Sequence, residues 1–167
     1  MGAGAALLLA ATAALALPRA GSQAPVARAT TVDGKVLVPR ALVGKIALIF
    51  YEDKDTANQN KALKDAIKEQ GRTTGHKDNV VIYAVADVSS YDYWPARGFV
   101  KSAIQEEEAK SGTPIYLDWS GAFRKAFDFQ AGSSNIVLLG PDNKVKLAHV
   151  GVVPAALRAT ILREIGK

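Results

Sequence analysis

The chain has 167 residues, of which 49% are hydrophobic and 22% charged, a composition typical of a single folded domain. It contains no cysteine, which excludes disulfides, thiol nucleophiles, CxxC redox pairs and thiolate metal sites. The net charge of +5 is modest and scattered, and because no nucleic-acid recognition motif accompanies it, we expect no nucleic-acid partner.

The chain opens with a run of alanine and leucine at residues 5–17. Spanning a bilayer takes about 20 apolar residues, so this run is too short to cross one. It suits the apolar region of a secretory signal peptide, and small residues follow it up to Ala24. We expect residues 1–24 to be a cleaved signal peptide, with an uncleaved anchor or a helical arm as the alternatives.

The cleavage position stays open between two imperfect sites. Cleavage after Ala20 places Pro18 three residues before the cut, and cleavage after Ala24 places Pro25 directly behind it. The expected product is a periplasmic or secreted protein with its folded domain at residues 25–167 and no stable membrane span. A cysteine-free chain is compatible with an oxidising compartment.

Apolar patterning predicts alternating strands and helices after the leader. Unbroken apolar runs indicate strands buried on both faces, and apolar residues spaced three to four apart indicate helices. The predicted strands lie at residues 36–38, 46–51, 80–85, 113–118, 135–139 and 144–150. The predicted helices lie at residues 56–70, 97–109, 122–127 and 154–165. This order predicts an α/β sandwich in which a mixed sheet lies between helices.

Three strings carry a family resemblance: GFVKSAI at residues 98–104, YLDWSGAFRKAF at residues 116–127 and SSNIVLLGPDNKVKLAHVG at residues 133–151. They are similar to the periplasmic YtfJ family of bacterial proteins, within the thioredoxin-like superfamily. The resemblance implies a thioredoxin-like three-layer α/β/α sandwich with a mixed central sheet. It also implies export, and it assigns no biochemical role.

In thioredoxin-like enzymes a cysteine pair opens the helix after the central strand and faces a cis-proline. The corresponding positions here are residues 55–58 and either Ser134 or Asn135, so the redox site is missing. Asp55 is expected to cap the helix instead, since a carboxylate there accepts unpaired backbone N–H groups. The candidate ligand or helix N-cap site comprises Asp55, Thr56, Asn58, Asp87, Ser134 and Asn135.

An acidic rim follows the two central strands. Its members are Glu52, Asp53, Asp55 and Asp87, which are weak candidates for Ca²⁺ or Mg²⁺ ligands, since no known loop spacing is present. A solvated rim with one helix cap is the simpler interpretation. His76 and His149 have no visible nucleophile partner, and Ser133 and Ser134 lack the G-x-S-x-G elbow, so no catalytic residue is predicted.

Aromatic residues gather before the second long helix. Tyr91, Tyr93 and Trp94 form a candidate partner surface, because aromatic residues are enriched at interface hot spots. The alternative is that Trp94 and Phe99 pack this helix onto the sheet.

These observations favour an exported, non-redox protein that acts as a binding or accessory module in the cell envelope. Its partner would be an envelope protein or a small ligand of unknown identity, and no cofactor is expected. The alternative is a cysteine-free enzyme or divalent-metal-binding protein that uses the acidic rim. A domain with a purely structural role cannot be separated from the binding module by sequence.

Overall fold

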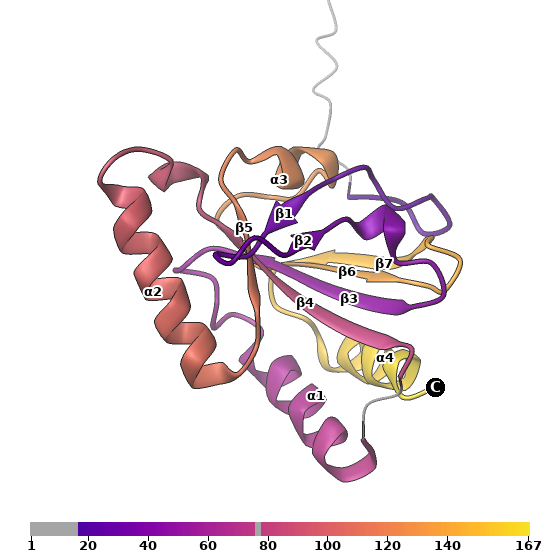
Figure 1. The fold of residues 1–167 in the computed structure, drawn as a ribbon. Coiled ribbons are helices and arrows are strands. Elements are labelled where there is room, and N and C mark those ends of the chain that lie inside the picture. Colours follow the sequence, from indigo (N-terminus) through magenta and orange to yellow (C-terminus); the bar gives the residue numbers. More distant parts are fainter. Residues whose placement is uncertain (1–16, 76–77) are drawn as a thin grey trace, which may run out of the picture.

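The computed structural model describes residues 17–75 and 78–167, which form one seven-stranded sheet flanked by helices (Figure 1). The strands are β1 (Ala29–Thr30), β2 (Val36–Leu37), β3 (Ile46–Glu52), β4 (Val80–Asp87), β5 (Ile115–Asp118), β6 (Asn135–Leu139) and β7 (Val145–Val150). The helices are α1 (Lys61–Thr74), α2 (Ala96–Ser111), α3 (Ala122–Ala126) and α4 (Ala155–Ile165). Short 3-10 turns lie at η1 (Pro39–Ala41) and η2 (Ser89–Tyr91).

The sheet is mixed and its strand order is β2-β1-β5-β4-β3-β6-β7. Parallel pairs join β3 to β4 and β4 to β5, whereas all other neighbours are antiparallel. The predicted α/β sandwich with a mixed sheet is confirmed, and the sequence patterns missed only the two-residue strand β1. Pro39, which ends residues 36–38, predicts an edge or opening strand, and β2 lies at the edge of the sheet.

The sheet has a hydrophobic core on each face. On one face α1 and α4 contribute Leu63, Ile67, Ile161 and Ile165. On the other face α3 and the loop after it contribute Phe123, Phe127 and Phe129, which stack around Tyr51. Strand β3 lies between β4 and β6 and is buried along residues 46–51, as its unbroken apolar run predicts.

Helix α2 differs from the prediction. Apolar spacing predicts an inner stripe of Phe99, Val100, Ala103 and Ile104 on this helix. Phe99 and Ala103 are instead exposed, and no residue of α2 is fully buried. Val100 and Ile104 are half-buried. Figure 1 shows α2 at the side of the molecule, away from α1 and α4. Strand β4 is accordingly less buried than its apolar sequence predicts.

A β-bulge in β7 changes another expectation. The register shift opposite Leu138 and Leu139 places Val145 in the core with α3 and Leu147 in the core with α1 and α4. Simple strand alternation predicts Val145, Leu147 and His149 on one face. This is wrong for Val145, because an extra residue in a bulge reverses the alternation. Within residues 17–75 and 78–167, no helix is long and apolar enough to cross a bilayer.

Candidate functional site

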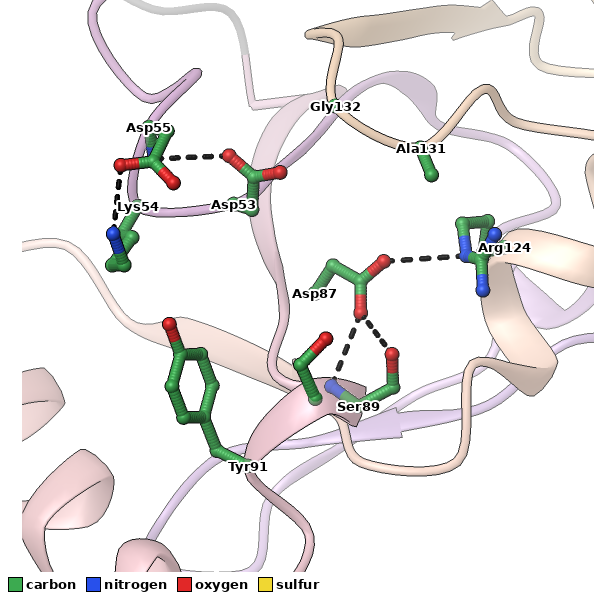
Figure 2. Close-up of a pocket in the computed structure, with 10 residues that line it drawn as sticks. Asp53, Lys54, Asp55, Asp87, Ser89, Tyr91, Arg124, Ala131 and Gly132 are labelled. Atoms are coloured by element: carbon green, nitrogen blue, oxygen red, sulfur yellow. Dashed lines mark hydrogen bonds and ion pairs between the residues drawn. The ribbon is translucent and has the colours of Figure 1, made fainter.

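A pocket of about 300 Å³ opens where β3 and β4 end (Figure 2). The carboxyl ends of parallel strands are the usual place for ligands in open α/β sheets. The pocket is polar and carries charges of both signs. It is lined by Asp53, Lys54, Asp55, Asp87, Ser89, Ser90, Tyr91, Arg124, Ala131 and Gly132.

One wall of the pocket is the turn between β3 and α1. The Asp53 carboxylate accepts the backbone N–H groups of Asp55 and Thr56, both at 2.9 Å. Helix α1 begins only at Lys61 and its N-cap is Asn60, so the prediction that Asp55 caps the helix is wrong. A stretch of turns separates the strand from the helix, and this leaves Asp55 exposed, where it pairs with Lys54 at 2.8 Å.

Asn60 lies behind the pocket in a buried polar network. Its side-chain amide donates to the Ser134 hydroxyl and to the Gly151 carbonyl, both at 2.9 Å. Its side-chain oxygen accepts the backbone N–H of Val153 at 2.8 Å. One side chain therefore joins the start of α1 to the loops before β6 and after β7.

Ser134, one of the two residues that the resemblance aligns with the cis-proline, completes this network. Its backbone N–H donates to the Gln59 side chain at 2.7 Å, and its hydroxyl donates to Glu52 at 2.6 Å. Glu52 in turn pairs with Lys64 at 2.5 Å. Ser134 is fully buried, and its hydrogen-bonding groups bind partners within the chain. These bonds join the end of β3, the start of α1 and the loop before β6.

The other wall of the pocket is formed around Asp87. One carboxylate oxygen lies 3.3 Å from the Arg124 Nε, and the other accepts both the backbone N–H and the hydroxyl of Ser89 (Figure 2). The left-handed turn that brings α3 to this wall is made by Gly121, with φ of 68°. A side chain at Gly121 would also meet Arg124 and Ser89.

Buried polar groups hold Arg124 and the start of α3 in place. Asp118 is 2% exposed, and one of its carboxylate oxygens accepts the Tyr51 hydroxyl at 3.0 Å and the Arg124 backbone N–H at 3.1 Å. Burial, followed by the negative charges of Asp118 and Asp87, raises the pKa of Tyr51 far above its ordinary value. The Tyr51 phenol therefore stays protonated and acts as a hydrogen-bond donor.

The structure separates the six residues of the predicted ligand or cap site. Asp55 and Asp87 line the pocket, and Asn58 is exposed but outside its lining. Thr56, Ser134 and Asn135 are buried, and the Asn135 side chain bonds only to the backbone of Gln130 and Ser133 among the residues described. These three belong to the framework behind the pocket.

Sequence reasoning did not identify Arg124, Ser89, Tyr51, Asp118 or Asn60 as site residues. Arg124 lies in the string YLDWSGAFRKAF, but nothing in its spacing shows that it meets a strand end 37 residues earlier (124 minus 87). The contact forms because β5 pairs beside β4 and is followed by α3, which carries Arg124 to the end of β4.

The acidic rim does not assemble into a metal site. Glu52 faces Lys64 and Ser134, whereas Asp87 faces Arg124 and Ser89. In the described parts of the chain, no three side chains of His, Cys, Asp or Glu come together as a metal ion would require. His149 bonds through Nε2 to the Val152 carbonyl at 3.0 Å, and His76 lies outside the described residues.

The aromatic surface is exposed. Trp94 is 91% exposed, Phe99 73% and Tyr93 60%, so the alternative that Trp94 and Phe99 pack α2 onto the sheet is wrong. Tyr91 is half-buried and lines the pocket. The aromatic surface, defined as Tyr93, Trp94 and Phe99, thus begins two residues beyond the pocket rim.

The fold and the site together define a thioredoxin-like protein without redox cysteines. Solved structures agree with this class. A candidate thiol:disulfide interchange protein DsbE from Chlorobium tepidum superposes with a TM-score of 0.65 at 17% identity, covering 89% of this chain and 99% of its own. A candidate protein disulfide isomerase from Bacteroides thetaiotaomicron gives 0.65 at 18% identity, covering 89% and 88%. At these identities the likeness shows the fold alone.

The exposed lipoprotein thioredoxin Etrx1 of Streptococcus pneumoniae is also similar, with a TM-score of 0.61, 16% identity and coverage of 83% of this chain and 98% of its own. No curated protein sequence matches the chain. The family described as "Bacterial protein of unknown function (YtfJ_HI0045)" matches residues 28–167. The chain therefore belongs to the YtfJ family, which confirms the resemblance seen in its sequence.

Proposed function

We propose that this protein is an exported, non-redox binding module of the bacterial cell envelope, and that it holds its partner at the pocket between Asp53 and Arg124. The observation that carries the proposal is the contrast between two neighbouring regions. The side chains of Asn60, Ser134 and Glu52 bond to one another, whereas the polar pocket between Asp53 and Arg124 is open.

Thiol chemistry has no place in this proposal. Disulfide exchange and thiol peroxidase reactions both start from a thiolate, and the chain has no cysteine to supply one. Ser134 bonds instead to Asn60, Gln59 and Glu52, and these hydrogen bonds favour a rigid site. A rigid site favours recognition, because less freedom is lost when a partner binds.

The pocket presents groups suited to a polar partner. The Arg124 guanidinium, held by Asp87, offers planar N–H donors that match a carboxylate, and Asp53 and Asp55 on the opposite wall offer acceptors for an amine. A peptide segment or a small zwitterion carries both kinds of group. The aromatic surface beyond Tyr91 supplies apolar area for a larger envelope partner.

The divalent-metal alternative loses its structural support. Its four carboxylates were expected to converge at one rim, but Glu52 and Asp87 are each committed to basic and hydroxyl partners on different walls. The pocket itself keeps both charge signs, which suits the binding proposal better than an oxygen-only cation site.

Site-directed photo-crosslinking tests the proposed function. A photoreactive amino acid replaces Tyr91 at the pocket rim, and the control replaces Val43, which is 70% exposed and precedes β3 at the opposite end of that strand. Each variant is expressed in bacterial cells, which are then irradiated. We expect a discrete cross-linked adduct from position 91 and none from position 43. The variant Arg124→Gln should lose the adduct, whereas Arg163→Gln, at an exposed arginine of α4, should keep it. Equal adducts from both positions, or an adduct indifferent to Arg124→Gln, would contradict the proposal.

A further inference from the structure

The segment before β1 completes the edge of the sheet beside β7. Gln23 forms an antiparallel bridge with Lys144. The Gly21 N–H donates to the Val145 carbonyl and the Val145 N–H donates to the Ser22 carbonyl, both at 2.8 Å. These bonds cover the first residues of an edge strand whose backbone groups would otherwise be unpaired.

Ala24 fixes the segment in the core. Its side chain is 0% exposed and lies in the cluster with the aromatic residues of α3. Its N–H donates to the Asn143 carbonyl at 2.9 Å, and its carbonyl accepts the Arg40 Nε at 3.0 Å. The Asn143 side chain in turn donates to the Arg40 carbonyl at 2.5 Å. Residues 21–24 are therefore an integral part of the fold.

The residues just before this segment form an exposed turn. The Ser22 N–H and hydroxyl both bond to the Arg19 carbonyl, at 3.0 and 2.7 Å, and Gly21 adopts φ of 87° in the resulting turn. Arg19 and Ala20 are exposed, and Leu17 is only partly buried against the core. The peptide bond between Ala20 and Gly21 thus lies in an exposed turn, and its N–H makes the first bond to β7.

We infer that the leader is removed by hydrolysis of the Ala20–Gly21 peptide bond, an inference that rests on the proposed export. Water adds across the amide, which leaves a carboxylate on Ala20 and an ammonium on Gly21. The Gly21 ammonium keeps N–H groups for the Val145 carbonyl, so the sheet edge survives. Ala20 is a small residue directly before the cut, as the cleavage signature requires, whereas Pro18 departs from that signature three residues before the cut.

The other cleavage positions would damage the fold. A cut after Ser22 removes both backbone bonds to Val145. A cut after Ala24 also removes the Gln23–Lys144 bridge and a fully buried side chain, and it would have to precede Pro25. Of these three products, only the one that begins at Gly21 retains the complete segment.

Expression of the full chain in a Gram-negative host, followed by fractionation and intact-mass measurement, tests the inference. We expect a periplasmic protein whose mass corresponds to residues 21–167. A periplasmic protein that begins at Gln23, Pro25 or any other residue overturns the inference but leaves export standing. An uncleaved chain in the cytoplasm or membrane overturns both the inference and the proposed export.

A variant pair gives a second readout. Ala20→Leu places a large residue before the cut and should leave at least ten times more precursor than the wild type. Gln23→Leu changes an exposed residue beyond the cut and should still yield residues 21–167. Normal processing of Ala20→Leu would overturn the assignment.

Discussion

Asn60 connects three segments that are far apart in the sequence. It lies 74 residues from Ser134, 91 from Gly151 and 93 from Val153, yet it bonds to all three. Its side chain is 2% exposed, so water does not substitute for these partners. A buried polar group that loses its partner costs about 1–3 kcal/mol, and Asn60 satisfies several such groups at once.

Replacing Asn60 by alanine should therefore destabilise the protein strongly. We expect the free energy of unfolding to fall by about 3 kcal/mol for Asn60→Ala, because the Val153 N–H and the Gly151 carbonyl lose a buried partner. The matched control is Asn58→Ala in the same turn, which is exposed and should change stability by less than about 0.5 kcal/mol. Urea unfolding measures both. Equal losses would show that the network does not stabilise the fold.

The ion pairs of Glu164 make the stability of the folded protein depend on pH. Hydrogen bonds from Lys146, at 2.7 Å, and from Lys167 lower the pKa of this carboxyl to about 2. A carboxyl with a lowered pKa stabilises the folded state above its unfolded pKa, and this contribution disappears as the pH falls from about 4.5 toward 2. The lysines are partly exposed, so screening by water keeps the effect below about 1 kcal/mol.

We therefore expect Glu164→Gln to lower the melting temperature at pH 7 and to match the wild type near pH 2. Thermal melts across this pH range measure the difference. Glu106→Gln, at an exposed glutamate of α2, serves as the control and should follow the wild type at every pH. A Glu164→Gln deficit that persists at pH 2 would mean that packing, and not the charge, causes it.

At the scale of elements, the helices on the sheet differ in how they are held. Helix α4 buries Ile161 and Ile165 and partly buries Leu157, which are spaced four apart as predicted. Helix α2 has a comparable number of apolar residues but buries none of them fully. Periodicity thus identified both helices, but it did not show which of them lies firmly on the sheet.

A pair of truncations distinguishes the two helices. Ile161→Ala should cost about 2–5 kcal/mol of unfolding free energy, because Ile161 is 0% exposed and leaves a cavity. Phe99→Ala should change it by less than about 0.5 kcal/mol, since Phe99 is 73% exposed. Chemical denaturation of both variants provides the measurement. A loss above 2 kcal/mol for Phe99→Ala would show that α2 packs onto the domain in solution.

On the scale of the whole molecule, the thioredoxin-like sheet is present in a chain that has no cysteine. Strands β3 and β4 still end at a common edge, and the loops before β6 and after β7 still approach the start of α1. Polar side chains now join these loops, and a pocket persists beside them. This arrangement is consistent with a scaffold that recognises a partner without thiol chemistry.

The amino-acid sequence by itself determined the alternation of strands and helices, the buried position of residues 46–51 and the absence of thiol chemistry. Each depends on composition or on local apolar spacing, which a single chain displays directly. Only the tertiary structure revealed that Asn60 is the helix cap, that Arg124 meets Asp87 and that Ala24 belongs to the core. These contacts join residues that the folding of the sheet brings together, and no local spacing encodes them.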